Sequence, residues 1–168
     1  MTDSTPDEQK PSIEWTLWFQ WVLATTVGWA IGWALVGEIG VGVVVGIAQW
    51  LVLRQLLQQA GWWIWASTVG WAIGWAMIVT GVIVPPNIGV VASVVAGLVL
   101  GALLGVAQWF YLRRQVYQAG WWVLASSVGW GIGLTGIVGG TVTGAIAGVV
   151  TGFTLDWLLR NPRSEREE

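Results

Sequence analysis

The stretch at residues 46–74, GIAQWLVLRQLLQQAGWWIWASTVGWAIG, occurs again at residues 105–133 as GVAQWFYLRRQVYQAGWWVLASSVGWGIG. The copies are offset by 59 residues without a gap, and 18 of the 29 positions are identical. Each copy leaves an apolar run at Gln-Trp and Leu-Arg, crosses a polar turn and enters a second apolar run at Trp-Trp. This pattern predicts the end of one membrane helix, a short loop and the start of the next.

The composition places the whole chain in the membrane class. Of its 168 residues, 55% are hydrophobic and only 10% are charged, whereas soluble domains carry about 25% charged residues. No basic stripe is present that could neutralise phosphates, so nucleic acid is not expected as a partner.

Polar residues and turn signals divide the apolar sequence into six predicted helices, which makes the expected fold all-α. Pro85-Pro86 predicts a helix end, because proline cannot donate a backbone N–H. Gly139-Gly140 predicts a turn, because one helix over residues 121–159 would be about 58 Å long, too long for a bilayer. The predicted transmembrane helices are 15–37, 39–54, 62–84, 88–112, 121–138 and 141–159. Residues 1–14 and 160–168 are expected to be disordered tails.

The cations predict the orientation in the membrane. All seven Lys and Arg residues lie in the tails or in the loops after the second and fourth predicted helices: Lys10, Arg54, Arg113, Arg114, Arg160, Arg163 and Arg166. The positive-inside rule then places both termini in the cytoplasm.

The repetition extends to the first predicted helix, because residues 26–34 and 68–76 share the identical sequence TVGWAIGWA. We therefore expect three helical hairpins in parallel orientation, arranged around a pseudo-threefold axis along the membrane normal. The last helix is the most divergent, and Asp156-Trp157 is expected roughly where Gln-Trp stands in the other hairpins.

Glycines spaced four residues apart resemble a glycine zipper. In lipid, helices associate by close packing at small residues, because hydrophobic exclusion contributes little. The alternatives are an oligomer contact, or a groove for a lipid or a flat pigment. The expected packing positions are Gly28, Gly32, Gly70, Gly74, Gly129, Gly133, Gly144, Gly148 and Gly152.

The chain contains 16 tryptophans, and most fall near the predicted cytoplasmic helix ends, among them Trp21, Trp62, Trp63, Trp121 and Trp122. An interfacial aromatic belt explains this placement. Because a plain belt should occur on both sides, a surface for a protein or ligand is the alternative.

Trp29, Trp71 and Trp130 are expected deep in the membrane, with their indole N–H groups bonded to nearby hydroxyls, such as Ser67 and Ser126, or to i−4 carbonyls. The simplest interpretation is that they fill gaps between helices beside glycines. The alternative is a ring that lines a pathway or holds an apolar ligand.

Gln49 and Gln108 precede their arginines by five residues, so they are expected about 7.5 Å inside the cytoplasmic interface. A hydrogen bond to a neighbouring helix is the simplest interpretation, and a ligand or ion contact is the alternative. The chain has no histidine or cysteine, and we find no nucleophile–base pair or metal-ligand cluster. We therefore expect a protein that is not an enzyme and that has no metal or cofactor.

The motif Gly-x-x-x-Gly-x-x-Gln-Trp-x-x-Leu-Arg, followed by Trp-Trp-x-x-Ala-Ser-x-x-Gly-Trp, resembles a family of uncharacterised polytopic membrane proteins from bacteria, cyanobacteria among them. The resemblance covers the first five predicted helices and weakens in the sixth. It implies a bacterial inner or thylakoid-type membrane and no particular activity.

Two classes of function follow. The first is a non-catalytic membrane protein that acts by binding, as a scaffold, assembly factor or accessory subunit with an aromatic cytoplasmic face. Its expected partners are membrane lipids and either another membrane protein or a second copy. The second is a passive channel along the pseudo-threefold axis.

Overall fold

The computed structural model describes residues 14–82, 89–135 and 140–162, and these contain six α-helices and one π-helical turn. The tails, except for residues 14 and 160–162, lie outside the described residues. The elements are α1 (Trp15–Ile31), the π-helical turn η1 (Gly32–Val36), α2 (Val41–Leu53), α3 (Trp62–Val79), α4 (Gly89–Leu112), α5 (Gly120–Gly133) and α6 (Thr141–Leu159).

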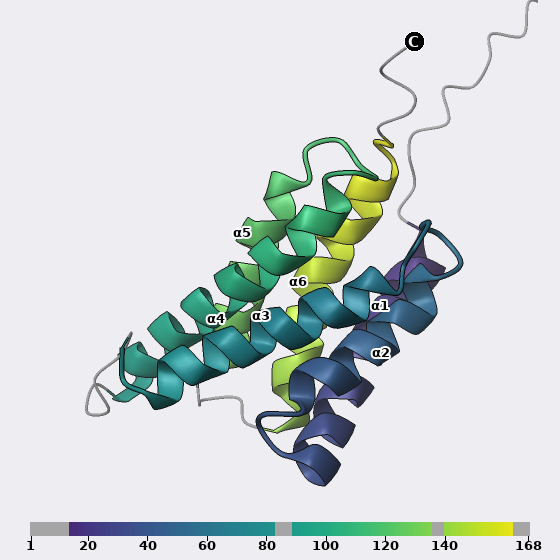
Figure 1. The fold of residues 1–168 in the computed structure, drawn as a ribbon. Helices are drawn as coiled ribbons and strands as arrows, with labels where there is room; N and C mark the ends of the chain where they lie inside the picture. Colours follow the sequence, from purple (N-terminus) through teal and green to yellow (C-terminus); the bar gives the residue numbers. More distant parts are fainter. Residues whose placement is uncertain (1–13, 83–88, 136–139, 163–168) are drawn as a thin grey trace, which may run out of the picture.

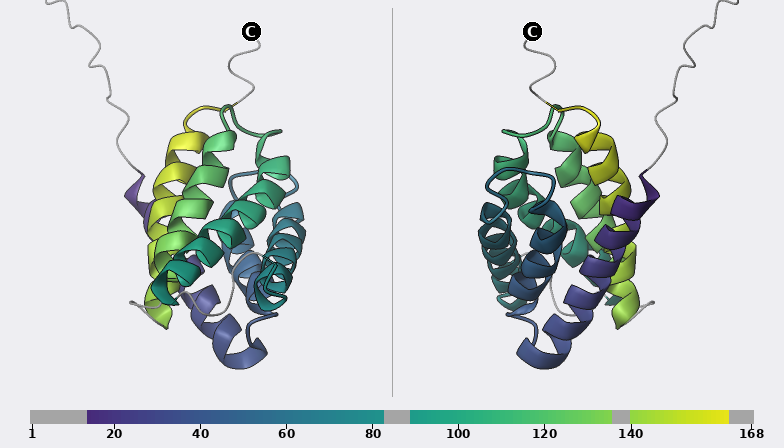
Figure 2. Two further views of the ribbon diagram at one scale, coloured as in Figure 1. Left: turned by 90° about the vertical axis from the view of Figure 1, so that its left-hand side faces the viewer. Right: turned by 90° about the vertical axis from the view of Figure 1, so that its right-hand side faces the viewer.

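The helices form a closed ring (Figure 1, Figure 2). Each packs against the next one in the chain, and α6 packs against α1. Four are long and apolar enough to cross a membrane: Trp15–Val36, Trp62–Val79, Gly89–Leu112 and Val142–Leu159. α2 and α5 are shorter, with 13 and 14 residues. The fold is thus an all-α bundle with the helices of a multi-pass membrane protein.

Several helix ends differ from the predicted ones. α1 changes to a π-helical turn at Gly32, and α2 begins at Val41 rather than at residue 39. α3 ends at Val79, five residues early, and Gly81 follows with φ of 68°. α5 ends at Gly133, also five residues before its predicted end. Glycine-rich sequence near these ends explains the early stops, because glycine is a poor helix former; residues 83–84 and 136–138 lie outside the described parts.

The bundle is apolar on its outside as well as in its core, and a few polar side chains are buried among the core residues, unlike a soluble helical bundle, whose surface is polar. Leu51, Val69 and Ile73 are 46%, 48% and 49% exposed. In contrast, Gln49 and Gln108 are only 5% and 2% exposed. Such a surface fits a hydrocarbon solvent, where apolar side chains face lipid and polar groups bond to one another inside.

Each described helix presents a pair of glycines to the next helix in the ring. A Cβ added at Gly70 would lie 2.8 Å from the Cα of Leu104, and one at Gly105 would lie 2.9 Å from the Cα of Val123. The pairs are Gly28 on α1 with Gly32 at the start of η1, Gly42–Gly46 on α2, Gly70–Gly74 on α3, Gly101–Gly105 on α4, Gly129–Gly133 on α5 and Gly144–Gly148 on α6. The predicted packing position Gly152 lies against Trp18 and Trp21 of α1.

Candidate functional site

A first tryptophan layer, formed by Trp21, Trp63 and Trp122, fills the centre of the ring. Their ring centroids lie 5.4–5.8 Å apart in edge-to-face contacts, and each side chain is at most 1% exposed. They come from α1, α3 and α5, which are not neighbours in the ring. The predicted interfacial position of these three tryptophans is therefore wrong.

The Trp-Trp pairs explain this error. Consecutive residues of a helix point about 100° apart, so one member of each pair faces inward. The other member faces outward, and Trp62 and Trp121 are 63% and 56% exposed. Within each pair, only the outer member occupies a position expected of an aromatic belt.

A second tryptophan layer, formed by Trp29, Trp71 and Trp130, lies eight residues further along the same helices, or about 12 Å. Its centroids lie 5.2–5.7 Å apart, and the three side chains are 2–6% exposed. The structure thus brings together the three predicted deep tryptophans, packed against one another rather than lining an open path.

Buried polar side chains join the helices between the two layers. Gln49 accepts a hydrogen bond from Trp63 Nε1 (3.0 Å) and donates one to Thr25 Oγ1 (3.0 Å). Gln108 accepts from Trp122 Nε1 (2.8 Å) and donates to Ser67 Oγ (2.9 Å). Ser126, a further predicted site residue, is 1% exposed and stands on α5 where Thr25 and Ser67 stand on α1 and α3. These contacts match the simpler interpretation, in which each glutamine holds neighbouring helices.

The third hairpin uses Thr151 in place of a glutamine. Thr151 follows Gly144 and Gly148 at the spacing that separates Gln49 and Gln108 from their own glycine pairs. It accepts from Trp21 Nε1 (3.0 Å) and donates to the carbonyl of Ala147 (2.6 Å). The expectation that Asp156 occupies this position is therefore wrong.

Asp156 instead occupies the position of Arg54 and Arg113 in the other hairpins. Its two carboxylate oxygens accept from Arg160 Nη2 at 2.8 and 2.9 Å. It also accepts the backbone N–H of Glu14, at 3.2 Å. Asp156 thus has a structural role where the chain enters α1 and leaves α6.

Two of the three indole N–H groups of the second layer bond to carbonyls in the connections between helices, not to the expected hydroxyls or i−4 carbonyls. Trp71 Nε1 donates to the carbonyl of Glu38 (2.7 Å), and Trp29 Nε1 donates to that of Gly140 (3.0 Å). The Glu38 carbonyl is available to Trp71 because Glu38 lies in the turn before α2, which begins only at Val41. No local sequence pattern predicts these hydrogen bonds, since they join segments far apart in the chain.

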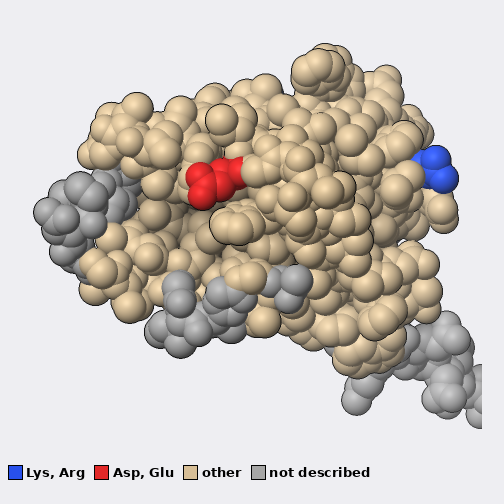
Figure 3. Space-filling view, turned by 90° about the horizontal axis from the view of Figure 1, so that it is seen from below, with Lys and Arg blue, Asp and Glu red and all other residues tan. Residues whose placement is uncertain are grey.

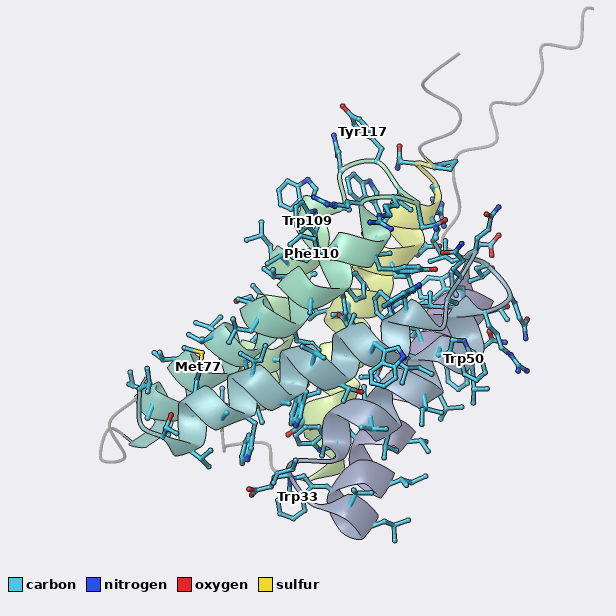
Figure 4. All side chains as sticks on the ribbon, in the orientation of Figure 1. Trp33, Trp50, Met77, Trp109, Phe110 and Tyr117 are labelled. Carbon is cyan, nitrogen blue, oxygen red and sulfur yellow. The ribbon has the colours of Figure 1, made fainter. Side chains whose placement is uncertain are left out.

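A cavity of about 430 Å³ lies beyond the second layer. It is at the end of the bundle that contains Glu38, which we call the Glu38 end. The arginines lie at the opposite end, which we call the arginine end. Figure 3, the view from below, shows a group of acidic atoms beside a hollow on a face with little other charge. Figure 4 shows Trp33 at the end of the molecule opposite Tyr117. The described lining is Trp29, Ala30, Trp33, Ala34, Glu38, Trp71, Trp75, Gly133, Leu134, Gly140 and Thr143.

Trp33, Trp75 and Glu38 were not among the predicted site residues. A signal was present, because the repeated TVGWAIGWA places a second tryptophan four residues after Trp29 and after Trp71. Residues four apart share a helix face. Trp71 and Trp75 stack with their rings 3° from parallel and their centroids 6.3 Å apart.

Two lateral grooves lie between neighbouring helices on the outside of the bundle. One, of about 460 Å³, lies between α3 and α4 and includes Trp65, Phe110 and Arg114. The other, of about 490 Å³, lies between α5 and α6 and includes Leu124 and Phe153. Their outward position suits contact with lipid tails.

Comparison with known proteins gives no family assignment. No family model matches the chain, and no curated protein or solved structure is significantly similar to it. Among the described residues, no group of His, Cys, Asp and Glu is placed to hold a metal ion. The tryptophan layers and the cavity are therefore the features from which a function is inferred.

Proposed function

We propose that this protein is a non-catalytic membrane protein of six spans that acts by binding a small ligand in the cavity at the Glu38 end. Three parallel hairpins surround a pseudo-threefold axis, and both termini are cytoplasmic, in a bacterial inner or thylakoid-type membrane. The repeated glycine pairs, tryptophan layers and glutamine bridges support this arrangement, because equivalent contacts recur from hairpin to hairpin.

The observation that carries the proposal is that the second tryptophan layer closes the ring while its outer side borders a cavity. A passive channel requires a continuous path, and two successive layers of touching indoles fill the place where that path would run. A cavity with an aromatic floor is typical of a ligand site. The geometry therefore favours binding over conduction.

The walls of this cavity are held in place before a ligand arrives. Trp29 and Trp71 are buried and each is fixed by a hydrogen bond to a backbone carbonyl. A site that is already ordered loses less conformational entropy on binding. This rigidity supports a binding role rather than simple gap filling.

The exposed aromatic residues at the arginine end have a different role in this proposal. Trp62, Trp65 and Trp121 are 56–66% exposed around the circumference of the bundle. We assign them to the membrane interface, where tryptophan anchors helices against lipid headgroups. A contact with another membrane protein or a second copy would use the same surface.

The proposal is tested by a thermal-shift screen of small aromatic compounds on the purified protein in maltoside detergent, together with a solute-release assay in vesicles. We expect at least one compound to raise the melting temperature of the wild type and to have a weaker effect on Trp33→Leu. Trp65→Leu, which changes another exposed tryptophan at the other end, is the matched control. Specific release of small solutes by wild-type vesicles would instead support the channel.

A further inference from the structure

We propose that the ligand of this cavity is an organic cation, namely an ammonium group carried on a small apolar body. This inference depends on the proposed binding function and names the chemical class of its ligand. It comes from three features of the cavity: its four tryptophans, the negative charge of Glu38 at an end of the chain without Lys or Arg, and the hydrogen bonds that already occupy two of the indole N–H groups.

The first feature is the indole lining. Trp29, Trp33, Trp71 and Trp75 all border the cavity. Indole is the best aromatic partner for a cation, because the electron-rich face of the ring attracts positive charge. Aromatic walls of this kind recognise quaternary ammonium groups without requiring a hydrogen bond from the ligand.

The second feature is the charge at this end. Glu38 lines the cavity, and the sequence has no Lys or Arg between residues 11 and 53, 55 and 112, or 115 and 159. All cations therefore belong to the tails and to the turns at the arginine end. The turn containing Glu38 thus contributes negative charge to a mostly apolar site, which favours a positively charged ligand.

The third feature is how the indole donors are used. Trp29 and Trp71 already donate their N–H groups to Gly140 and Glu38 carbonyls. The donors of these two side chains, which line the cavity, are therefore not free to bind an anion. A cavity of about 430 Å³ is within the size range of small-molecule sites.

The test is calorimetric titration of the full-length protein in uncharged maltoside detergent with benzyltrimethylammonium. Competition then compares choline with its uncharged carbon isostere, in which a tert-butyl group replaces the trimethylammonium group. We expect choline to compete at least about tenfold better than the isostere, since a charge interaction worth ~1.4 kcal/mol changes affinity tenfold.

Substitutions at Glu38 and Trp33 test the named residues. Glu38→Gln should weaken benzyltrimethylammonium binding by at least about tenfold, while Glu38→Asp, which keeps the charge, should retain most of the affinity. Glu38 is exposed and uses its backbone carbonyl to hold Trp71, so neither change should disturb the fold. Trp33→Leu should weaken binding about threefold or more, as expected for loss of a cation–π contact, and Trp65→Leu should not.

The outcomes separate this inference from the proposed function. If the uncharged isostere competes as well as choline, or if Glu38→Gln binds the cation normally, the site binds apolar ligands without regard to charge and the cation inference is overturned. If neither the cation nor any neutral aromatic compound binds, the proposed binding function fails as well. Cation binding that survives in Trp33→Leu and Glu38→Gln together would place the ligand elsewhere.

Discussion

The indole N–H of Trp122 lies 2.8 Å from Gln108 Oε1, at the level where α3, α4 and α5 meet. The amide nitrogen of the same glutamine donates to Ser67 on α3. One side chain on α4 thus ties both of its neighbouring helices to itself. Gln49 does the same for α1 and α3 from its place on α2.

We predict that Gln108→Leu destabilises the protein, because it leaves both Trp122 Nε1 and Ser67 Oγ without their present partner. Loss of a buried partner costs about 1–3 kcal/mol, which lowers the melting temperature by about 2–4 °C per kcal/mol for a chain of this size. Thermal unfolding in maltoside measures the change. The exposed Gln55→Leu is the control, and equal melting of the two variants would contradict the bridging role.

A second prediction concerns the glycine pairs. A Cβ at Gly101 would overlap the carbonyl oxygen of Ser126 and would lie 2.8 Å from the Cα of Ser127. Gly101→Ala should therefore push α4 away from α5 and destabilise the bundle by about 1–3 kcal/mol or more. At Gly61 an added Cβ meets nothing within 4 Å, so Gly61→Ala should melt at or above the wild-type temperature.

The helices and much of their packing were predictable because both depend on local pattern. Apolar length and polar turns predicted six helices, and small residues spaced four apart marked the faces of closest approach. Gln49 and Gln108 stood out because an amide inside an apolar run needs a partner. The identity of that partner, a tryptophan on the following helix, could not be predicted, since it depends on the direction in which the ring closes.

The burial of tryptophans in the first layer was the main feature that the sequence did not predict. Trp62 and Trp63 are adjacent in sequence and chemically identical, yet one is 63% exposed and the other fully buried. The helices are apolar on every side, so periodicity does not show which face points inward. The carbonyl acceptors of Trp29 and Trp71 were missed for another reason, because their positions depend on where α2 and α6 begin.

A third prediction concerns the six spans. Since the chain has no native cysteine, single cysteines report which side of the membrane each turn faces. A cysteine at Ile39, which is 77% exposed, should react with an impermeant maleimide added outside right-side-out vesicles. One at Gln58 should react only after permeabilisation. Reaction of both from outside would mean that α2, with only 13 residues, does not cross the membrane.

The same labelling tests α5, the other short helix. Cysteines at Tyr117 and Thr135 lie on either side of α5 (Gly120–Gly133). We expect only the cysteine at Thr135 to react from outside. Protection of both would leave α5 without a crossing, and the third hairpin would then differ from the other two.

The last prediction concerns the two tryptophan layers as successive barriers. If each closes the centre of the ring by itself, removing one indole from one layer should leave the other intact, about 12 Å away. Trp130→Leu opens the second layer, and Trp122→Phe keeps an aromatic ring in the first while removing its N–H. Both variants should melt below the wild type, because each loses packing or a hydrogen bond in a buried cluster.

Vesicles containing either folded variant should nevertheless retain a small fluorescent solute as well as wild-type vesicles do. If the solute is released from Trp130→Leu vesicles and not from Trp122→Phe vesicles, the second layer is the only barrier. That result would support a channel along the central axis that this layer closes.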